Sequence, residues 1–234
     1  MIFPLRDDVS TQHTPYITYA IIALNVGTWC LIQSFGFEPG LSESICQYGF
    51  VPGNLLETIA PGEAVRLSQN IVCRFWPEAE FFRLITSMFV HGGWMHIIGN
   101  MWFLWVFGDN VEESMGSFRF GVFYILAGVI AAFFQAATDT SSVVPMVGAS
   151  GAIGGVMGAY ALLYPRHKIQ TLVLFFVIRL PAVFVLGWWF IIQFLSGLPH
   201  LGAKENVAFW AHIGGFLAGL IMATLMRRDK HWDY

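Results

Sequence analysis

The chain has 234 residues, of which 56% are apolar and only 12% are charged, whereas soluble domains typically carry about 25% charged residues. Together with a mean hydropathy of +0.61, this composition excludes an ordinary soluble domain and predicts a protein that crosses a membrane several times. The formal net charge of −3 and the lack of a basic stripe argue against nucleic acid as a partner.

Six apolar stretches are long enough to cross a bilayer as helices, which requires roughly 20 residues each. They lie at residues 17–35, 93–112, 118–137, 147–164, 181–198 and 207–226. We therefore expect an all-α polytopic membrane protein, with a six-helix bundle forming one membrane-embedded domain over residues 1–234 and short tails. The first stretch has no clean small-residue cleavage site, so we expect it to remain as a helix.

The distribution of Lys and Arg indicates the orientation. With the N-terminus inside, eight of these residues fall on the cytoplasmic side and four on the outer side. Cytoplasmic loops carry an excess of basic residues. The sequence therefore predicts that both termini lie in the cytoplasm.

The connection between the first two spans, about residues 36–92, is expected to be a long outer loop with its own structure, because structureless loops of this length are uncommon. Cys46 and Cys73 lie in this loop. A disulfide between them and two free thiols both remain open, since spacing alone does not fix a bridge. Between the fourth and fifth spans, Pro181 is expected in the first turn of the fifth helix.

Small residues mark the faces on which two of the spans are expected to pack. The fourth span contains Gly148, Ala149, Ser150, Gly151, Ala152, Gly154, Gly155 and Gly158. In the sixth span His212, Gly215 and Gly219 share one helix face. Small residues let helices approach closely in lipid. We expect this packing to bring the ring of His212 to the hydroxyl of Ser150.

Polar side chains at bilayer depth are costly, so three of them on separate spans point to function. Ser150, His212 and Asn100 lie about three, five and seven residues into their helices, so their depths differ by only about 6 Å. Neutral histidine can activate a serine as a nucleophile. No Asp or Glu lies at matching depth, so we infer a Ser150–His212 dyad. Asn100, the Ser150 backbone N–H and His96 are candidate donors to an oxyanion.

Other chemistries fit this sequence less well. His91 and His96 could be metal or haem ligands, but their i, i+5 spacing would put them on different faces of a helix. There is no H-E-x-x-H motif for a zinc enzyme, and no pair of aspartates lies within two spans. No metal and no cofactor are therefore expected.

Three motifs, in this order, resemble those of the rhomboid intramembrane serine proteases. They are HGGWMHIIGN at residues 91–100, GASG at 148–151 and AHIGG at 211–215. The resemblance covers about residues 83–225 and implies a bacterial-type six-helix rhomboid in the inner membrane. It implies Ser150 as the nucleophile, His212 as the base and Asn100 with His96 as oxyanion partners. The implied substrates are single-span membrane proteins in the lipid bilayer, cut in or near the outer part of their helix.

Some positions depart from the family's pattern. Phe82-Arg83 stands where many rhomboids have Trp-Arg, which leaves Arg83 to order the outer loop. Gly154 stands where some members have an aromatic ring stacked on the histidine, so this source of support for the His212 ring is missing. No reacting group is lost.

The main hypothesis is an active serine endopeptidase of membrane helices. The second hypothesis is a non-catalytic rhomboid-like protein that binds transmembrane helices as a chaperone or scaffold, for which loss of Ser150 or His212 would have been the sign. A small transporter would show inverted repeats, and none is visible. The sequence is compatible with a homo-oligomer.

Overall fold

A computed structural model describes residues 2–66, 71–75, 80–198 and 207–228, and it places a helix in each of the six predicted stretches. These helices are α1 (Tyr16–Leu31), α5 (Trp94–Met115), α6 (Ser117–Ala136), α7 (Ser150–Leu163), α8 (Ala182–Ser196) and α9 (Phe209–Met226). Among the described residues, α6 and α9 are long and apolar enough to cross a membrane. The helices α1, α7 and α8 are apolar but have only 16, 14 and 15 residues.

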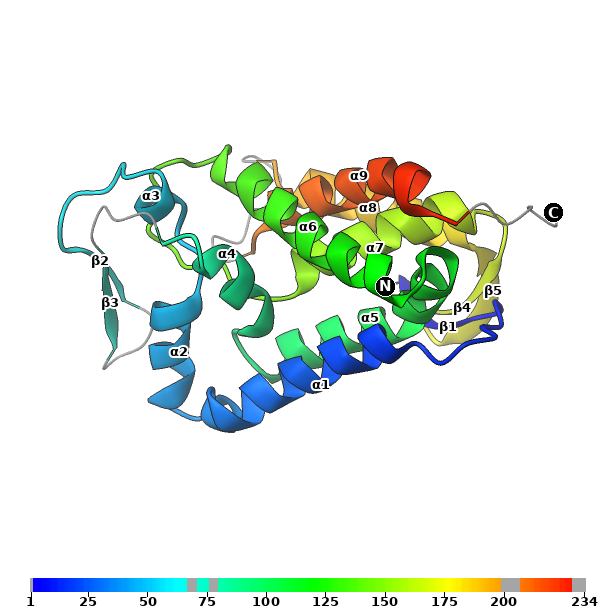
Figure 1. Cartoon of the computed structure of the whole chain (residues 1–234), viewed down its shortest axis with the longest axis horizontal. Coiled ribbons are helices and arrows are strands. Elements are labelled where there is room, and N and C mark those ends of the chain that lie inside the picture. The colour runs from blue at the N-terminus through cyan, green and yellow to red at the C-terminus, as the bar shows by residue number, and fades with distance from the viewer. Residues whose placement is uncertain (1, 67–70, 76–79, 199–206, 229–234) are drawn as a thin grey trace.

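The segment between α1 and α5 folds into a small structured unit at one end of the molecule (Figure 1). It contains η1 (Ser34–Gly36), α2 (Gly40–Tyr48), α3 (Pro52–Leu55), β2 (Glu63–Arg66), β3 (Val72–Phe75), α4 (Arg83–Thr86) and η2 (Ser87–Phe89). Strands β2 and β3 pair antiparallel. Cys46 and Cys73 form a disulfide with their Cα atoms 5.3 Å apart, which joins α2 to β3. The structure thus decides between the two alternatives that the sequence left open.

The opposite end of the molecule carries a three-stranded antiparallel sheet that we did not predict (Figure 1). Its strands are β1 (Ile2–Asp7), β4 (Lys168–Val173) and β5 (Phe176–Pro181), in the order β1-β4-β5. The predicted N-terminal tail is therefore an edge strand. Pro181 has extended dihedral angles (φ −56°, ψ 140°) and stands at the N-cap of α8. Its predicted place in the first helical turn is wrong, because this residue still belongs to β5.

Two buried or half-buried carboxylates tie the first elements to the bundle. Asp7 accepts hydrogen bonds from Asn110 Nδ2 (2.6 Å) and from Tyr160 Oη (2.7 Å), which connects β1 to α5 and α7. Glu112 of α5 accepts from the backbone N–H groups of residues 17 and 18 at the start of α1. These N–H groups have no partner within their own helix. Glu112 therefore completes α1 and holds its first turn against α5.

Helix α7 is the centre of the bundle, since 11 of its 14 residues are buried. Its glycines allow α9 to approach backbone to backbone. A Cβ at Gly215 would overlap the carbonyl oxygen of Gly151, and a Cβ at Gly219 would overlap that of Gly155. Without side chains at these positions, the two helices approach more closely than larger residues would allow. This approach sets the distance between the residues at the first turns of α7 and α9.

Gly219→Ala is expected to lower the thermal midpoint of the purified protein, because the added Cβ would meet the carbonyl oxygen of Gly155. Overpacking costs about 1–3 kcal/mol, more than the gain of about 1 kcal/mol from replacing a helical glycine with alanine. Gly187→Ala in α8 is the matched control, because a Cβ there would have no described atom within 4 Å apart from its chain neighbours and the backbone of its own helix. Thermal unfolding in detergent should separate the two variants; equal midpoints would contradict the close approach.

Candidate active site

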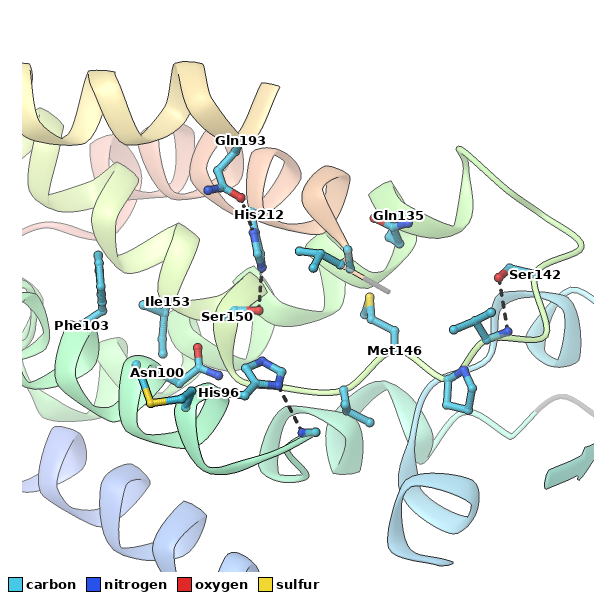
Figure 2. A pocket seen from close by; sticks show the side chains of 18 of the residues that line it. His96, Asn100, Phe103, Gln135, Ser142, Met146, Ser150, Ile153, Gln193 and His212 are labelled. Carbon is cyan, nitrogen blue, oxygen red and sulfur yellow. Dashed lines mark hydrogen bonds between the residues drawn. The ribbon is translucent and has the colours of Figure 1, made fainter. Parts of the chain in front are cut away.

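A cavity of about 810 Å³ lies between α5, α7, α8 and α9 and extends toward the structured segment that precedes α5. The polar residues that line its inner part come from all four helices: His96, Asn100, Ser150, Gln193 and His212. Figure 2 shows that the side chains of these five residues converge. The outer part of the lining comes from the segment before α7 and includes Ser142 and Met146. The predicted polar residues of three separate spans therefore face one cavity.

Ser150 and His212 are hydrogen-bonded, with 2.8 Å between Ser150 Oγ and His212 Nε2. Ser150 is the first residue of α7, and His212 lies in the first turn of α9. The segment that leads into α7 is held in place by two backbone contacts. Met146 pairs with Phe50 in an isolated β-bridge, and the N–H of Gly148 donates to the carbonyl of Ser87 (2.8 Å). The backbone just before Ser150 is therefore anchored at two points, and α7 begins at Ser150 itself.

Asn100 and His96 stand opposite this pair on one face of α5 (Figure 2). Asn100 is 7% exposed, and its Nδ2 has no hydrogen-bond partner among the described residues. His96 Nδ1 accepts a hydrogen bond from the N–H of Gly92 (3.2 Å). A neutral imidazole that accepts at Nδ1 carries its proton on Nε2. Both residues therefore offer the cavity an N–H donor that has no hydrogen-bond partner within the described ranges.

Gly148 leaves room for these donors. A Cβ at Gly148 would lie 2.5 Å from His96 Nε2 and 3.4 Å from Asn100 Nδ2, and the residue has a φ of +114° that favours glycine. Ser150 follows two residues later and begins α7, where the first N–H groups have no partner within the helix. The Ser150 N–H thus adds a backbone donor near the two side chains.

Three further residues support His212, and we did not single them out in the sequence. Gln193 Oε1 lies 2.7 Å from His212 Nδ1, and the Trp189 ring packs beside the imidazole with 6.0 Å between centroids. Gln135 Oε1 accepts from the N–H of Ala211 (3.1 Å). In the sequence, Gln135 and Gln193 could have been recognised as candidates because they are amide side chains near the ends of apolar stretches, where polar groups are costly.

The structure places Gly154 against the backbone of α9. A Cβ at Gly154 would lie 2.8 Å from the carbonyl oxygen of His212. An aromatic side chain at this position would therefore displace α9. The missing support from residue 154 is replaced by Trp189, which reaches the histidine ring from α8.

His91 and His96 lie closer together than their spacing suggested. The ring centroids are 5.1 Å apart, because His91 precedes α5 and the helical spacing argument does not apply to it. His91 is fully buried, and neither ring nitrogen has a hydrogen-bond partner in the described part of the chain. Within the described ranges, no group of three or more His, Cys, Asp or Glu residues could hold a metal ion.

Arg83 lies at the start of α4 and connects several parts of the segment between α1 and α5. Its Nη1 donates to the carbonyl oxygens of Cys46 (2.8 Å) and Gly49 (3.2 Å). Its Nε lies 2.7 Å from the Glu80 carboxylate. The guanidinium also lies over the rings of Phe75 and Phe82, 5.8 Å from each centroid. These contacts join the end of α2 to β3 and α4.

The chain is similar in sequence to known rhomboid proteins. Residues 78–229 match the model of the Rhomboid domain. The chain is 29% identical to RHOMBOID-like protein 5 of Arabidopsis thaliana, over 69% of this chain and 49% of that protein. It is 27% identical to the mitochondrial RHOMBOID-like protein 6 of Arabidopsis thaliana, over 95% of this chain and 73% of that protein.

One bacterial relative is named as a protease. Rhomboid protease GluP of Bacillus subtilis is 27% identical over 92% of this chain and 36% of its own length. The chain thus spans about half of the first plant relative and about a third of the bacterial one. The domain match covers 152 of the 234 residues, including every polar residue of the inner cavity. This chain belongs to the rhomboid family of helical membrane proteins.

Proposed function

We propose that this protein is an intramembrane serine endopeptidase that cuts single-span membrane proteins in or near the outer part of their transmembrane helix. The observation that carries the proposal is the 2.8 Å hydrogen bond between Ser150 Oγ and His212 Nε2, at the wall of a cavity that also holds two unused N–H donors. The relative named as a rhomboid protease supports the same activity.

In this proposal, His212 Nε2 takes the proton from Ser150 Oγ as the oxygen attacks the carbonyl carbon of the substrate. The negative charge that develops on the carbonyl oxygen is stabilised by Asn100 Nδ2, His96 Nε2 and the Ser150 N–H. Collapse of the tetrahedral intermediate breaks the C–N bond, and the leaving amine takes the proton from His212. Water then attacks the acyl-enzyme with His212 as its base, which releases the acid and restores Ser150.

We also propose how the chain sits in the bilayer. The six helices α1, α5, α6, α7, α8 and α9 cross the plasma membrane, with both termini on the cytoplasmic side. The excess of Lys and Arg on that side supports this orientation. The segment from α2 to α4 would then lie on the outer face, where oxidation of Cys46 and Cys73 is expected. We assign Arg83 the role of ordering this outer segment.

Removal of either reacting group should stop the reaction. Ser150→Ala is expected to abolish both cleavage of a single-span substrate and labelling by a fluorophosphonate probe. His212→Ala is expected to lower both rates by about 10²–10⁴-fold, because the general base is lost. Ser196→Ala and His167→Ala are matched controls outside the cavity, and they should behave as the unmodified protein does.

Labelling and cleavage should be measured together on folded protein in detergent. A helix-binding scaffold would still bind the substrate but would show neither labelling at Ser150 nor cleavage. That outcome, or full activity of the Ser150→Ala protein, would rule out the proposed function.

Asn100→Ala should lower kcat by about 10²–10³-fold with little change in KM, as expected for one oxyanion donor. Asn100→Asp is the sharper test, since the carboxylate has nearly the same shape but no N–H donor and repels the oxyanion. It should be at least as slow as Asn100→Ala. A variant that mainly raised KM would instead make Asn100 a substrate-binding residue.

Substrate choice should follow from backbone hydrogen bonding. A peptide carbonyl within a helix is bonded to the N–H four residues on, so Ser150 can reach it only after local unwinding. Unwinding in hydrocarbon costs several kcal/mol for each unsatisfied group. Favoured substrates should therefore carry Gly, Pro or polar residues in the outer half of their span, with a small residue such as Ala at the cut.

The test uses a single-span substrate with an Ala-Gly site in its outer third and variants in which the neighbouring Gly and Pro become Leu. The Leu variants should be cut more slowly, and mass spectrometry should place the cut on the outer side. Short unstructured peptides with the same sequences are the control, and the Leu changes should matter little there. Equal rates for both membrane substrates would contradict this account.

A further inference from the structure

The second nitrogen of the catalytic histidine faces an amide from a different helix. Gln193, near the C-terminal end of α8, places Oε1 2.7 Å from His212 Nδ1. Figure 2 shows Gln193, His212 and Ser150 in one line, joined by two hydrogen bonds. Gln193 also lines the cavity. In the described part of the chain, it is the residue hydrogen-bonded to this nitrogen.

The amide oxygen selects the tautomer that the reaction requires. A neutral imidazole has one N–H donor and one acceptor nitrogen. To receive the Ser150 proton, Nε2 must be the acceptor, so the ring proton must stand on Nδ1. An oxygen at 2.7 Å stabilises this tautomer, because it accepts from Nδ1–H and would repel a lone pair there. The hydrogen bond on one ring nitrogen thus sets the state of the other.

Helix α8, which carries Gln193, also fixes the orientation of the His212 ring. Trp189 lies one turn before Gln193 on α8, and its ring is tilted by 34° relative to the His212 ring. On the α7 side, Gly154 packs on the carbonyl of His212 and leaves no space for an aromatic ring. Gln193 and Trp189 therefore hold the imidazole from α8, Phe209 adds an edge contact from α9 with 6.4 Å between ring centroids, and the nucleophile comes from α7.

We propose that Gln193 is a positioning residue of this site, which keeps His212 in the Nδ1–H tautomer and aims Nε2 at Ser150. This inference rests on the proposed function. A glutamine suits this place because a neutral amide can orient the ring without a permanent charge in the membrane, where charged groups are costly. It takes the orienting role that an aspartate has in a catalytic triad.

The test compares two substitutions of nearly equal size. Gln193→Met removes the acceptor and should lower kcat about 10–100-fold with little change in KM. This loss is larger than that expected from one neutral hydrogen bond and smaller than that caused by locking the histidine in the wrong tautomer. Gln193→Glu keeps an acceptor oxygen and should retain kcat within about tenfold, as expected if the hydrogen bond is what matters. Ile192→Met is the control, since Ile192 is the neighbouring residue and is 41% exposed.

A second measurement separates positioning from simple packing. Nitrogen NMR of protein labelled with ¹⁵N-histidine reports which ring nitrogen carries the proton, and a His212→Gln sample identifies the His212 signals. Unmodified protein should show protonation at Nδ1, and Gln193→Met should shift the signals toward the Nε2–H form. Unchanged kcat in Gln193→Met, or an unchanged tautomer with reduced kcat, would overturn the inference. Absence of probe labelling in the unmodified protein would instead overturn the proposed function.

Discussion

The close approach of α7 and α9 is the constraint on which the site depends. Gly215 lies on the carbonyl of Gly151, and Gly219 lies on that of Gly155. Ser150 and His212 stand at the first turns of these two helices, so the separation of the axes determines the distance from Oγ to Nε2. A methyl group at either contact would move α9 by more than the tolerance of a 2.8 Å hydrogen bond. The glycines are therefore a condition of the chemistry as well as of the packing.

The length of α7 explains how a serine inside a bundle can meet water. With 14 residues, α7 spans only about 21 Å, less than the roughly 30 Å of a hydrocarbon core. The chain before it, anchored by the bridge between Met146 and Phe50, lines the cavity instead of continuing the helix. The hydroxyl thus lines the cavity, next to the first N–H groups of α7, which have no partner within the helix.

The pattern of the sequence predicts much of this arrangement and misses parts that depend on tertiary contacts. Helices lie in the six apolar stretches because their length and small-residue faces are local properties. The sheet was missed because residues 169–178 form an apolar run that periodicity cannot assign, and the turn has Leu174 at positive φ where glycine would have been the signal. Gln193 could not be predicted as the partner of His212, because a neutral amide in an apolar helix lacks the charge that marks the aspartate of a triad.

The polar groups of the inner cavity form an uncharged set. Asn100, Gln193, His96 and Ser150 act as hydrogen-bond donors or acceptors without a permanent charge, while the carboxylates of Asp7 and Glu112 lie toward the sheet end, hydrogen-bonded to other elements. A permanent charge at bilayer depth costs several kcal/mol. In the proposed reaction, charge arises only as an oxyanion and an imidazolium formed together, a few ångströms apart. Each stabilises the other while it lasts, so the resting protein need not bury an unpaired ion to be ready for catalysis.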